Sequence, residues 1–340
     1  MRLLVGIPAY NEAATIAEVI GRIPRRLDGI DGVEVLVVDD GSTDDTARLA
    51  GEAGAAVIRH PQNSGVGVAF QTMVRHALSS RADLLVTVDG DGQFNPEDIP
   101  ALIAPILAGE ALVCTASRFL DPDLIPAMPW VKKWGNRRVA ALVNALTGQR
   151  YTDVSCGFRA YTREALLRLT VYHSFTYTHE TFLDLAAKRV SIVEVPLEVR
   201  GVREVGRSRV ASSVLRYALR TAAIMLRTYR DQRPLTLCLW IAIPHWLVAI
   251  ALFGYSLYHF VAQGFWIKYL AFMGAGLGAI GITVLFFGFM ADISSRLRRN
   301  QEEILYWLRR AGGGDGHLDR RLQPPQDPAA PEPADRRAAE

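Results

Sequence analysis

The sequence predicts an α/β protein with a mostly parallel sheet, followed by an amphipathic helix and a two-helix transmembrane hairpin. Short apolar runs alternate with helical patterns through the first third of the chain, which is typical of a sheet covered on both faces. Two later apolar stretches, at about 235–261 and 265–291, each exceed the roughly 20 residues that a helix needs to cross a bilayer. The chain therefore joins a globular part to a membrane part.

The predicted strands are apolar runs without polar alternation, as expected where both faces of a sheet are buried. We place them at 3–8, 33–39, 55–60, 84–89 and 111–117, with further strands at 157–161 and 191–196. Helical patterns lie between or after them at 12–27, 43–53, 66–79, 96–108, 134–147 and 178–188. Thr43 and Asn95, the latter before Pro96, are expected to start helices.

Polar motifs follow three of these strands. "PAYNE" follows the first strand, "DDGS" the second and "DGDGQ" the fourth. Because ligands of parallel sheets bind beyond the carboxyl ends of the strands, we expect the three motifs to converge on one rim.

The most informative motif holds two carboxylates, Asp89 and Asp91, on a glycine-rich turn. An ordinary Asx turn has the same spacing. However, Gly90 and Gly92 leave room for a diphosphate, and Gln93 adds an amide oxygen. Such oxygens are ligands that Mg²⁺ or Mn²⁺ accepts while sharing its shell with phosphate. The motif therefore predicts a divalent ion that neutralises charge on a departing nucleoside diphosphate.

The second rim motif contains Asp39, Asp40 and Ser42. An acid at this point can accept hydrogen bonds from a base or ribose, although turn and cap chemistry explains the same residues. Gly65 and Gly67 do not complete a G-x-G-x-x-G dinucleotide motif.

The membrane part has its own pattern. An amphipathic helix at 210–233 carries arginines on one face, which suits either a membrane interface or packing on the globular domain. Arginines precede the first span, and Arg296, Arg298 and Arg299 follow the second, so both flanks are expected in the cytoplasm. Small residues recur every four positions in 274–281, which favours close helix contact.

Composition excludes other classes of function. A formal net charge of +3 is too small to indicate a nucleic-acid partner. Three widely spaced cysteines predict neither a disulfide framework nor a zinc site. The N-terminus lacks the apolar region of a signal peptide, so the first part is expected to stay in the cytoplasm.

Residues 1–210 resemble the family 2 (GT-A) glycosyltransferases, in particular the dolichyl-phosphate mannose synthase-like branch that transfers sugars to polyprenyl phosphate. The resemblance rests on eight motifs in order: "PAYNE", "VVDDGS", "NSGVGVA", "DGDGQ", "ASRF", "DVSCGFRAY", "VEVP" and "VREVGRSR". It implies a GT-A, Rossmann-like fold.

Carried over by position, the resemblance implies three groups of site residues. The nucleotide-sugar site would comprise Pro8, Tyr10, Glu12, Val38, Asp40, Asp89, Gly90, Asp91, Gln93, Arg118, Arg203 and Arg209. Asp89, Asp91 and Gln93 would hold Mg²⁺ or Mn²⁺, and Arg118, Lys132 and Asn136 would bind the acceptor phosphate. Asp91 and Arg118 would be the catalytic pair. The chain departs from the family at two places: Arg209 replaces a frequent lysine, and "REV", which begins at Arg203, stands where one small residue usually separates two basic residues.

The resemblance further implies an inverting enzyme that moves one hexose from GDP-mannose or a UDP-hexose to polyprenyl phosphate. A lipid monophosphate is already anionic near neutral pH, so it needs cations and no general base. One alternative is a transferase acting on a hydroxyl of a lipid-linked saccharide, with Glu180 as base. A membrane scaffold without activity is a second alternative. Asp153 is expected to order the "DVSCGFR" loop.

The expected organisation is a catalytic domain at 1–209, the amphipathic helix at 210–233, and a hairpin at 234–292. A basic juxtamembrane helix at 293–310 and a disordered tail at 311–340 follow. The protein would be a multi-pass protein of the cytoplasmic (inner) membrane, with the catalytic domain and the C-terminus in the cytoplasm. The nucleobase, the sugar, the lipid length and homo-oligomer formation remain open.

Overall fold

The structure is a computed structural model that describes residues 1–126, 128, 130–170, 177–200, 230 and 234–312. Three predictions therefore lie outside the described residues: the roles of Arg203 and Arg209, the amphipathic helix apart from residue 230, and the tail from residue 313 onward.

A seven-stranded sheet forms the centre of the globular part, in the order β3-β2-β1-β4-β6-β5-β7. All neighbouring strands are parallel except β6, which is antiparallel to both β4 and β5. This arrangement confirms the predicted mostly parallel sheet. The strands are β1 Arg2–Ala9, β2 Gly32–Asp39, β3 Ala56–Arg59, β4 Leu84–Thr87, β5 Val113–Ser117, β6 Arg159–Thr162 and β7 Ile192–Pro196.

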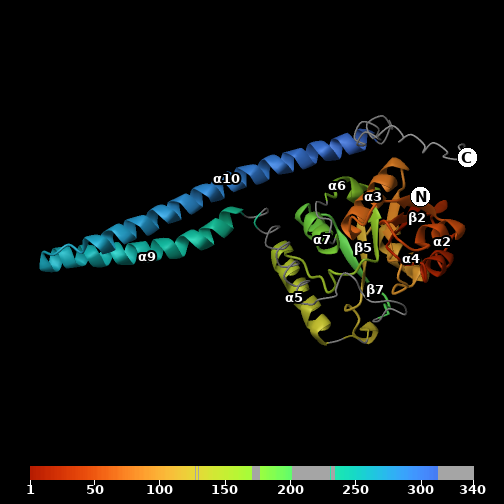
Figure 1. Ribbon diagram of the computed structural model, residues 1–340, viewed down its shortest axis with the longest axis horizontal. Helices are drawn as coiled ribbons and strands as arrows, with labels where there is room; N and C mark the ends of the chain where they lie inside the picture. Colours follow the sequence, from red (N-terminus) through yellow and green to blue (C-terminus); the bar gives the residue numbers. More distant parts are fainter. Residues whose placement is uncertain (127, 129, 171–176, 201–229, 231–233, 313–340) are drawn as a thin grey trace, which may run out of the picture.

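Helices cover both faces of the sheet (Figure 1). One apolar core lies under α1, α2 and α4, and a second lies under α3, α6 and α7. α5 packs separately against α7 through a small cluster that includes Val143 and Phe182. The helices are α1 Ile16–Gly21, α2 Thr46–Glu52, α3 Val66–Ser79, the 3₁₀ turn η1 Pro96–Asp98, α4 Ile99–Leu107, the 3₁₀ turn η2 Pro122–Leu124, α5 Trp130–Thr147, α6 Arg163–Arg168 and α7 Thr178–Ala187.

Three predicted helix starts differ from the structure. The helix expected at 12–27 is only Ile16–Gly21. It starts late because the backbone before it donates hydrogen bonds to the side chains of Ser42, Thr46 and Asp44. The second helix begins at Thr46 and not at Thr43, and the Asp44 carboxylate accepts the Thr46 N–H at 3.1 Å. The fifth helix begins at Trp130, four residues before the predicted start at 134. The predicted start at Asn95 is confirmed, since its side chain accepts from Glu97 N.

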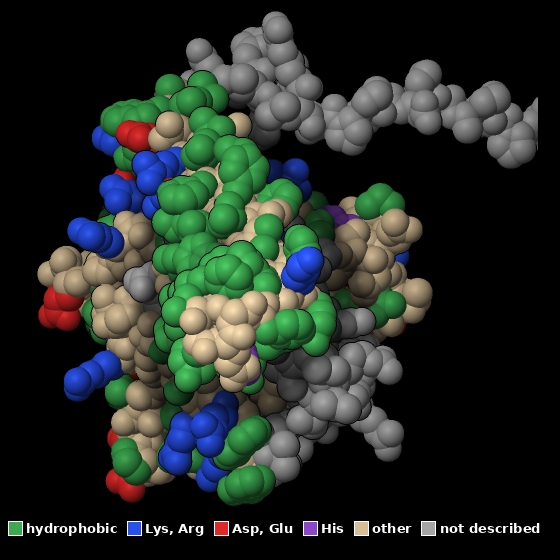
Figure 2. Space-filling view, turned by 90° about the vertical axis from the view of Figure 1, so that its left-hand side faces the viewer, with side chains coloured by type: hydrophobic (Ala, Val, Ile, Leu, Met, Phe, Trp, Pro, Cys, Tyr) green, Lys and Arg blue, Asp and Glu red, His purple; other side chains and the backbone are tan. Residues whose placement is uncertain are grey.

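Two long apolar helices, α9 Pro234–Gln263 and α10 Lys268–Gly312, form a hairpin that leaves the globular part (Figure 1). Both are long and apolar enough to cross a membrane by length and composition, and little of either is buried within the protein. Figure 2, in which the tip of the hairpin faces the reader, shows hydrophobic side chains over the hairpin and basic side chains around it. The predicted second span and the basic segment at 293–310 form one continuous helix.

The two helices pack through small residues spaced seven apart. A Cβ atom at Gly274, Gly281 or Gly288 would come within 3.0 Å of an α9 atom. On α9, the buried small residues Ala242, Ala249 and Ser256 repeat at the same interval. The predicted pair with a spacing of four, Gly274 and Gly278, also faces α9, since a Cβ atom at Gly278 would lie 3.9 Å from the Ala249 Cβ atom. A seven-residue repeat keeps one seam of each helix facing its partner, as in coiled coils.

We expect Gly281→Leu to separate the hairpin, because its side chain would overlap the Trp246 ring. Gly276→Leu is the matched control, since a Cβ atom at Gly276 meets nothing within 4 Å. Cysteine cross-linking between α9 and α10 in membranes checks the prediction. Cross-linking should fall severalfold in the Gly281 variant only, and equal cross-linking in both variants would contradict the packing.

Candidate active site

The first two rim motifs are joined by hydrogen bonds, which confirms that they converge. Asn11 adopts a left-handed backbone conformation (φ 53°), and its N–H donates to Ser42 Oγ at 2.8 Å. Its side-chain oxygen accepts the Thr43 N–H at 2.8 Å. The Glu12 N–H donates to Thr46 Oγ1 at 2.9 Å. Ser42 and Thr46 therefore fix the loop that contains Tyr10 and Glu12, two of the predicted nucleotide contacts.

Asp40, another predicted nucleotide contact, organises the loop after β3. Its carboxylate is almost fully buried and accepts the backbone N–H groups of Ser64, at 3.0 Å, and Gly65, at 2.7 Å. The His60 ring contacts the same carboxylate at 2.7 Å. Gly65 has φ 97°, a conformation that favours glycine. Asp40 thus positions the "NSG" loop beside the rim.

Pro8 and Val38 lie on the neighbouring strands β1 and β2, at the ends that approach the rim. The Val38 side chain is fully buried in the core on the α3 side of the sheet. Pro8 is half-buried. Their contact with a nucleotide stays a prediction.

The "DGDGQ" turn follows β4 on the same rim. Asp91 is buried, and its Oδ1 atom accepts the Gln93 N–H at 3.0 Å. Gly92 has φ 71°, and a Cβ atom there would meet open space. Gly90 differs, because its missing Cβ atom would lie 3.3 Å from Ile7 on the core side. Close packing of the turn onto the core therefore accounts for Gly90 in this structure.

The turn is also fastened to the segment after β7. The Gln93 side-chain amide donates to Arg200 O at 3.2 Å, and the Arg200 N–H donates to Gln93 O at 3.0 Å. Phe94 and Val199 form an antiparallel bridge beside them. Val199 and Arg200, the last described residues before Arg203 and Arg209 in the sequence, are therefore held against the carboxylate turn.

Arg118, at the end of β5, forms a bidentate pair with Asp153. Its Nε atom donates to Asp153 Oδ2 at 2.5 Å and its Nη2 atom to Oδ1 at 2.8 Å. Nη2 also donates to Ser155 Oγ at 2.6 Å. Burial raises the pKa of Asp153, but the Arg118 charge and hydrogen bonds outweigh it, so that the pKa is lowered overall. Asp153 thus stays ionised and orients the Arg118 side chain.

The loop at 153–157 connects Arg118 to the carboxylate turn. At its end, Gly157 lies against Asp89, and a Cβ atom there would stand 3.2 Å from Asp89 Oδ2. Thr87 fixes this approach by donating to Gly157 O at 2.7 Å. This loop therefore places Arg118, a predicted acceptor-phosphate residue, near Asp89, a predicted metal ligand. Asp153 accepts hydrogen bonds from the Ser155 N–H and hydroxyl, which confirms its expected role in ordering the loop.

Asn136 on α5 contacts the same loop. Its Nδ2 atom donates to Thr152 O at 3.0 Å, and its Oδ1 atom accepts from Ser155 Oγ at 3.0 Å. Ser155 therefore links Asn136 to Arg118 in a single hydrogen-bond network. Lys132 lies one turn earlier on α5, and its side chain is outside the described residues.

α7 carries Glu180 and His179 in its first turn, and both are buried. Burial, followed by the nearby Arg159 charge, lowers the pKa of His179 to about 4. His179 is consequently neutral at physiological pH and acts as a packing residue. Glu180 is 7% exposed, and its role as a base stays a prediction.

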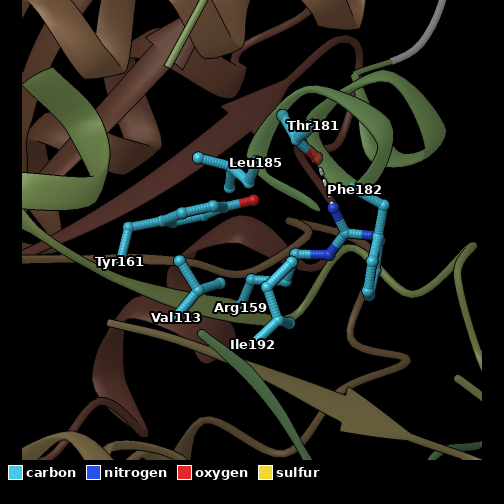
Figure 3. A pocket seen from close by; sticks show the side chains of 7 residues that line it. All are labelled: Val113, Arg159, Tyr161, Thr181, Phe182, Leu185 and Ile192. Atoms are coloured by element: carbon cyan, nitrogen blue, oxygen red, sulfur yellow. Dashed lines mark hydrogen bonds between the residues drawn. The ribbon is translucent and has the colours of Figure 1, made fainter. Parts of the chain in front are cut away.

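Arg159 is a buried residue whose role was not predicted. Its guanidinium donates to Thr178 O at 2.8 Å, to Thr181 Oγ1 and to Val154 O, and it lies over the Phe182 ring. Figure 3 shows Arg159 with Thr181 and Phe182 beside a small space that is too narrow for a water molecule. The space is therefore a packing gap and not a substrate site. It is lined by Val113, Arg159, Tyr161, Thr181, Phe182, Leu185 and Ile192.

Sequence reasoning missed two residues that hold the site together. Glu194 on β7 accepts the Thr152 and Asp153 N–H groups, both at 2.8 Å. The Tyr177 hydroxyl donates to Gly157 O at 3.3 Å, and burial and the Asp89 charge raise its pKa well above the usual value. Glu194 interrupts an otherwise apolar strand, a signal that could have identified it.

The residues of the turn fit a divalent ion held jointly with a diphosphate. Asp89 and Asp91 supply carboxylates at the rim, and Gly157 leaves the space beside Asp89 that a side chain would fill. Among the described residues there is no cluster of three or more His, Cys, Asp or Glu side chains that could hold a metal alone. Mg²⁺ commonly binds through one or two carboxylates plus substrate phosphates and water, which matches this donor set.

The fold and this site place the chain in a known class: it belongs to glycosyl transferase family 2, whose family model matches residues 4–170. Among its relatives, the UDP-N-acetylglucosamine–dolichyl-phosphate N-acetylglucosaminyltransferase of Methanococcus voltae is 31% identical, over 56% of this chain and 83% of that protein. The polyprenol monophosphomannose synthase of Mycolicibacterium smegmatis is also 31% identical, over 64% of this chain and 84% of that protein.

A solved structure with the same fold is glucosyl-3-phosphoglycerate synthase from Mycobacterium tuberculosis. It superposes with a TM-score of 0.54 and 27% identity, over 67% of this chain and 79% of that one. Structures of that enzyme hold UDP together with Mn²⁺ or Mg²⁺. The GT-A fold and the glycosyltransferase activity of the family are thereby established for this chain.

Proposed function

We propose that this glycosyltransferase transfers a single hexose, with inversion, from a nucleotide diphosphate sugar to polyprenyl phosphate at the cytoplasmic face of the membrane. The donor would be GDP-mannose or a UDP-hexose, bound at the rim formed by β1, β2 and β4. Asp89, Asp91 and Gln93 would hold Mg²⁺ or Mn²⁺, which when bound would offset charge on the leaving diphosphate.

One observation carries the acceptor class: Arg118 and Asn136 belong to one hydrogen-bond network, through Ser155 and Asp153. The network combines a positioned guanidinium with an amide, which are groups suited to phosphate. A phosphate acceptor is already charged and requires no base, so cations suffice on this side.

α5 supports a membrane location for that acceptor. It lies at the side of the globular part from which the hairpin extends (Figure 1). Its first turns expose Trp130 at 72% and Trp134 at 48%, with the Arg138 guanidinium over the Trp134 ring. Tryptophan and basic side chains are enriched where a helix meets lipid headgroups. We infer that α5 brings the acceptor side of the site to the bilayer surface.

The test is transfer in membranes. The enzyme would be incubated with undecaprenyl phosphate and a panel of GDP- and UDP-hexoses, and the lipid product identified by mass spectrometry. A glycosyl polyprenyl monophosphate is the expected product.

Two variants separate the acceptor classes. With a phosphate acceptor, Lys132→Ala should lower transfer at least about tenfold, while Glu180→Gln should retain most activity. With a hydroxyl acceptor the order reverses, because loss of a general base removes about 10²- to 10⁴-fold of rate. Activity lost only in Glu180→Gln would therefore contradict a phosphate acceptor.

A further inference from the structure

The cytoplasmic end of α10 lies against the globular part, across α6 (Figure 1). On its last turns Glu302, Leu305, Tyr306 and Arg309 are half-buried, while the residues between them are exposed. Positions three and four apart share one side of a helix. α10 therefore has a docking face at its cytoplasmic end, formed by these four residues.

Three side chains of the docking face make polar contacts with α6 and α7. The Tyr306 hydroxyl donates to Glu164 Oε1 at 3.2 Å. Arg309 Nη1 donates to Leu169 O at 2.8 Å, at the carboxyl end of α6, where carbonyl groups lack helical partners and a cation is favoured. Glu302 forms an ion pair with Lys188, which follows α7, at 3.2 Å. The docking face thus contacts the same layer of helices that carries Glu180.

The other end of this helix is fixed in the hairpin. Gly288 packs directly on Cys238 of α9. Glu302 lies 14 residues further along the same unbroken helix, which is about 21 Å at 1.5 Å per residue. The helix is therefore held at the membrane by one end and on the catalytic domain by the other.

We propose that residues 289–309 of α10 form a rigid strut that sets the height and tilt of the catalytic rim above the bilayer. The proposal rests on the proposed function, because only an acceptor whose phosphate lies at the headgroup level requires a fixed height. Displacement of reacting groups by about 1 Å can cost a hundredfold in rate.

A length change in the strut tests this. Seven alanines inserted between Ser294 and Ser295 lengthen the helix by about 10 Å and turn it by about two full turns, so that the docking face keeps its direction. The same seven residues inserted after Gly316, beyond the docking face, provide the matched control. Tyr306→Phe, which removes the contact with Glu164, should show a smaller effect than the insertion.

Two readouts are measured in vesicles. The first is energy transfer from a fluorophore on Glu52→Cys, an exposed α2 position, to labelled lipid headgroups. The second is hexose transfer to undecaprenyl phosphate in the bilayer, compared with transfer to a water-soluble ten-carbon prenyl phosphate. The insertion should lower energy transfer and lower the rate with the bilayer acceptor at least tenfold, while the soluble acceptor is used within about twofold of wild type.

Unchanged energy transfer in the insertion variant would overturn the strut, whatever the activities. Equal loss with both acceptors would also overturn it, because the insertion would then act on the site itself. If the wild type used neither acceptor, the proposed function would fail, and the energy-transfer measurement would still decide on the strut.

Discussion

Asp91→Asn is expected to reduce hexose transfer by at least about a hundredfold, equivalent to roughly 3 kcal/mol of transition-state stabilisation. The change removes one negative charge but retains the side-chain oxygen that accepts the Gln93 N–H, so the turn should keep its shape. The loss should appear both as a lower rate at saturating Mn²⁺ and as weaker Mn²⁺-dependent binding of nucleotide. Initial rates with Mn²⁺ titration and calorimetry of nucleotide binding measure the two effects.

Asp45→Asn serves as the control for this variant. Asp45 lies on the surface before α2 and pairs with Arg48, so its replacement should leave transfer unchanged. Stripping divalent ions from the wild type should reproduce the Asp91→Asn defect. Full activity in chelator, or in a variant lacking both Asp89 and Asp91, would contradict the proposed metal site.

Arg118→Ala is the second change with a large expected effect, and it should lower both activity and stability. The variant leaves Asp153 buried without its bidentate partner, which costs about 3–5 kcal/mol of stability for buried pairs. Transfer should fall about a hundredfold to a thousandfold, because a positioned donor at the phosphates is lost. Thermal unfolding and transfer rates measured on the same preparation report the two losses.

A paired variant separates these two effects. Arg118→Met combined with Asp153→Asn removes both charges, so no unpaired charge is left buried at position 153. Its unfolding temperature should recover much of the loss, while transfer stays low. Arg48→Ala is the control at an exposed arginine of α2 and should leave activity unchanged. If the paired variant regained transfer, Arg118 would have a structural role only.

Much of the fold could be predicted because its signals are local. Most of the strands are short, largely apolar runs, and turn residues such as Asn95 and Pro96 mark a helix start within a few positions. The convergence of the rim motifs followed from the parallel direction of β1, β2 and β4. The resemblance of ordered motifs then supplied the family, which the comparisons confirm.

The parts that were missed depend on contacts between distant residues. Glu194 and Thr152 are 42 positions apart. The charge of Glu194 in an otherwise apolar strand marks that residue, but it does not indicate which residue is its partner. α6, with six residues, is too short to show helical periodicity. The hairpin was predicted from hydropathy, but its seven-residue contact interval depends on which faces meet. The roles of the site residues remain predictions, including those of Arg203 and Arg209.

The reversed direction of β6 has a consequence for how such enzymes diversify. Because β6 runs against its neighbours, the loop that precedes it reaches the rim, whereas β1, β2 and β4 deliver the loops that follow them. Under the proposed function, acceptor recognition and donor recognition would be encoded in separate stretches of chain, which meet where Gly157 lies against Asp89. Exchange of the 118–157 stretch between relatives should therefore yield chimaeras with a new acceptor preference and the original nucleotide preference.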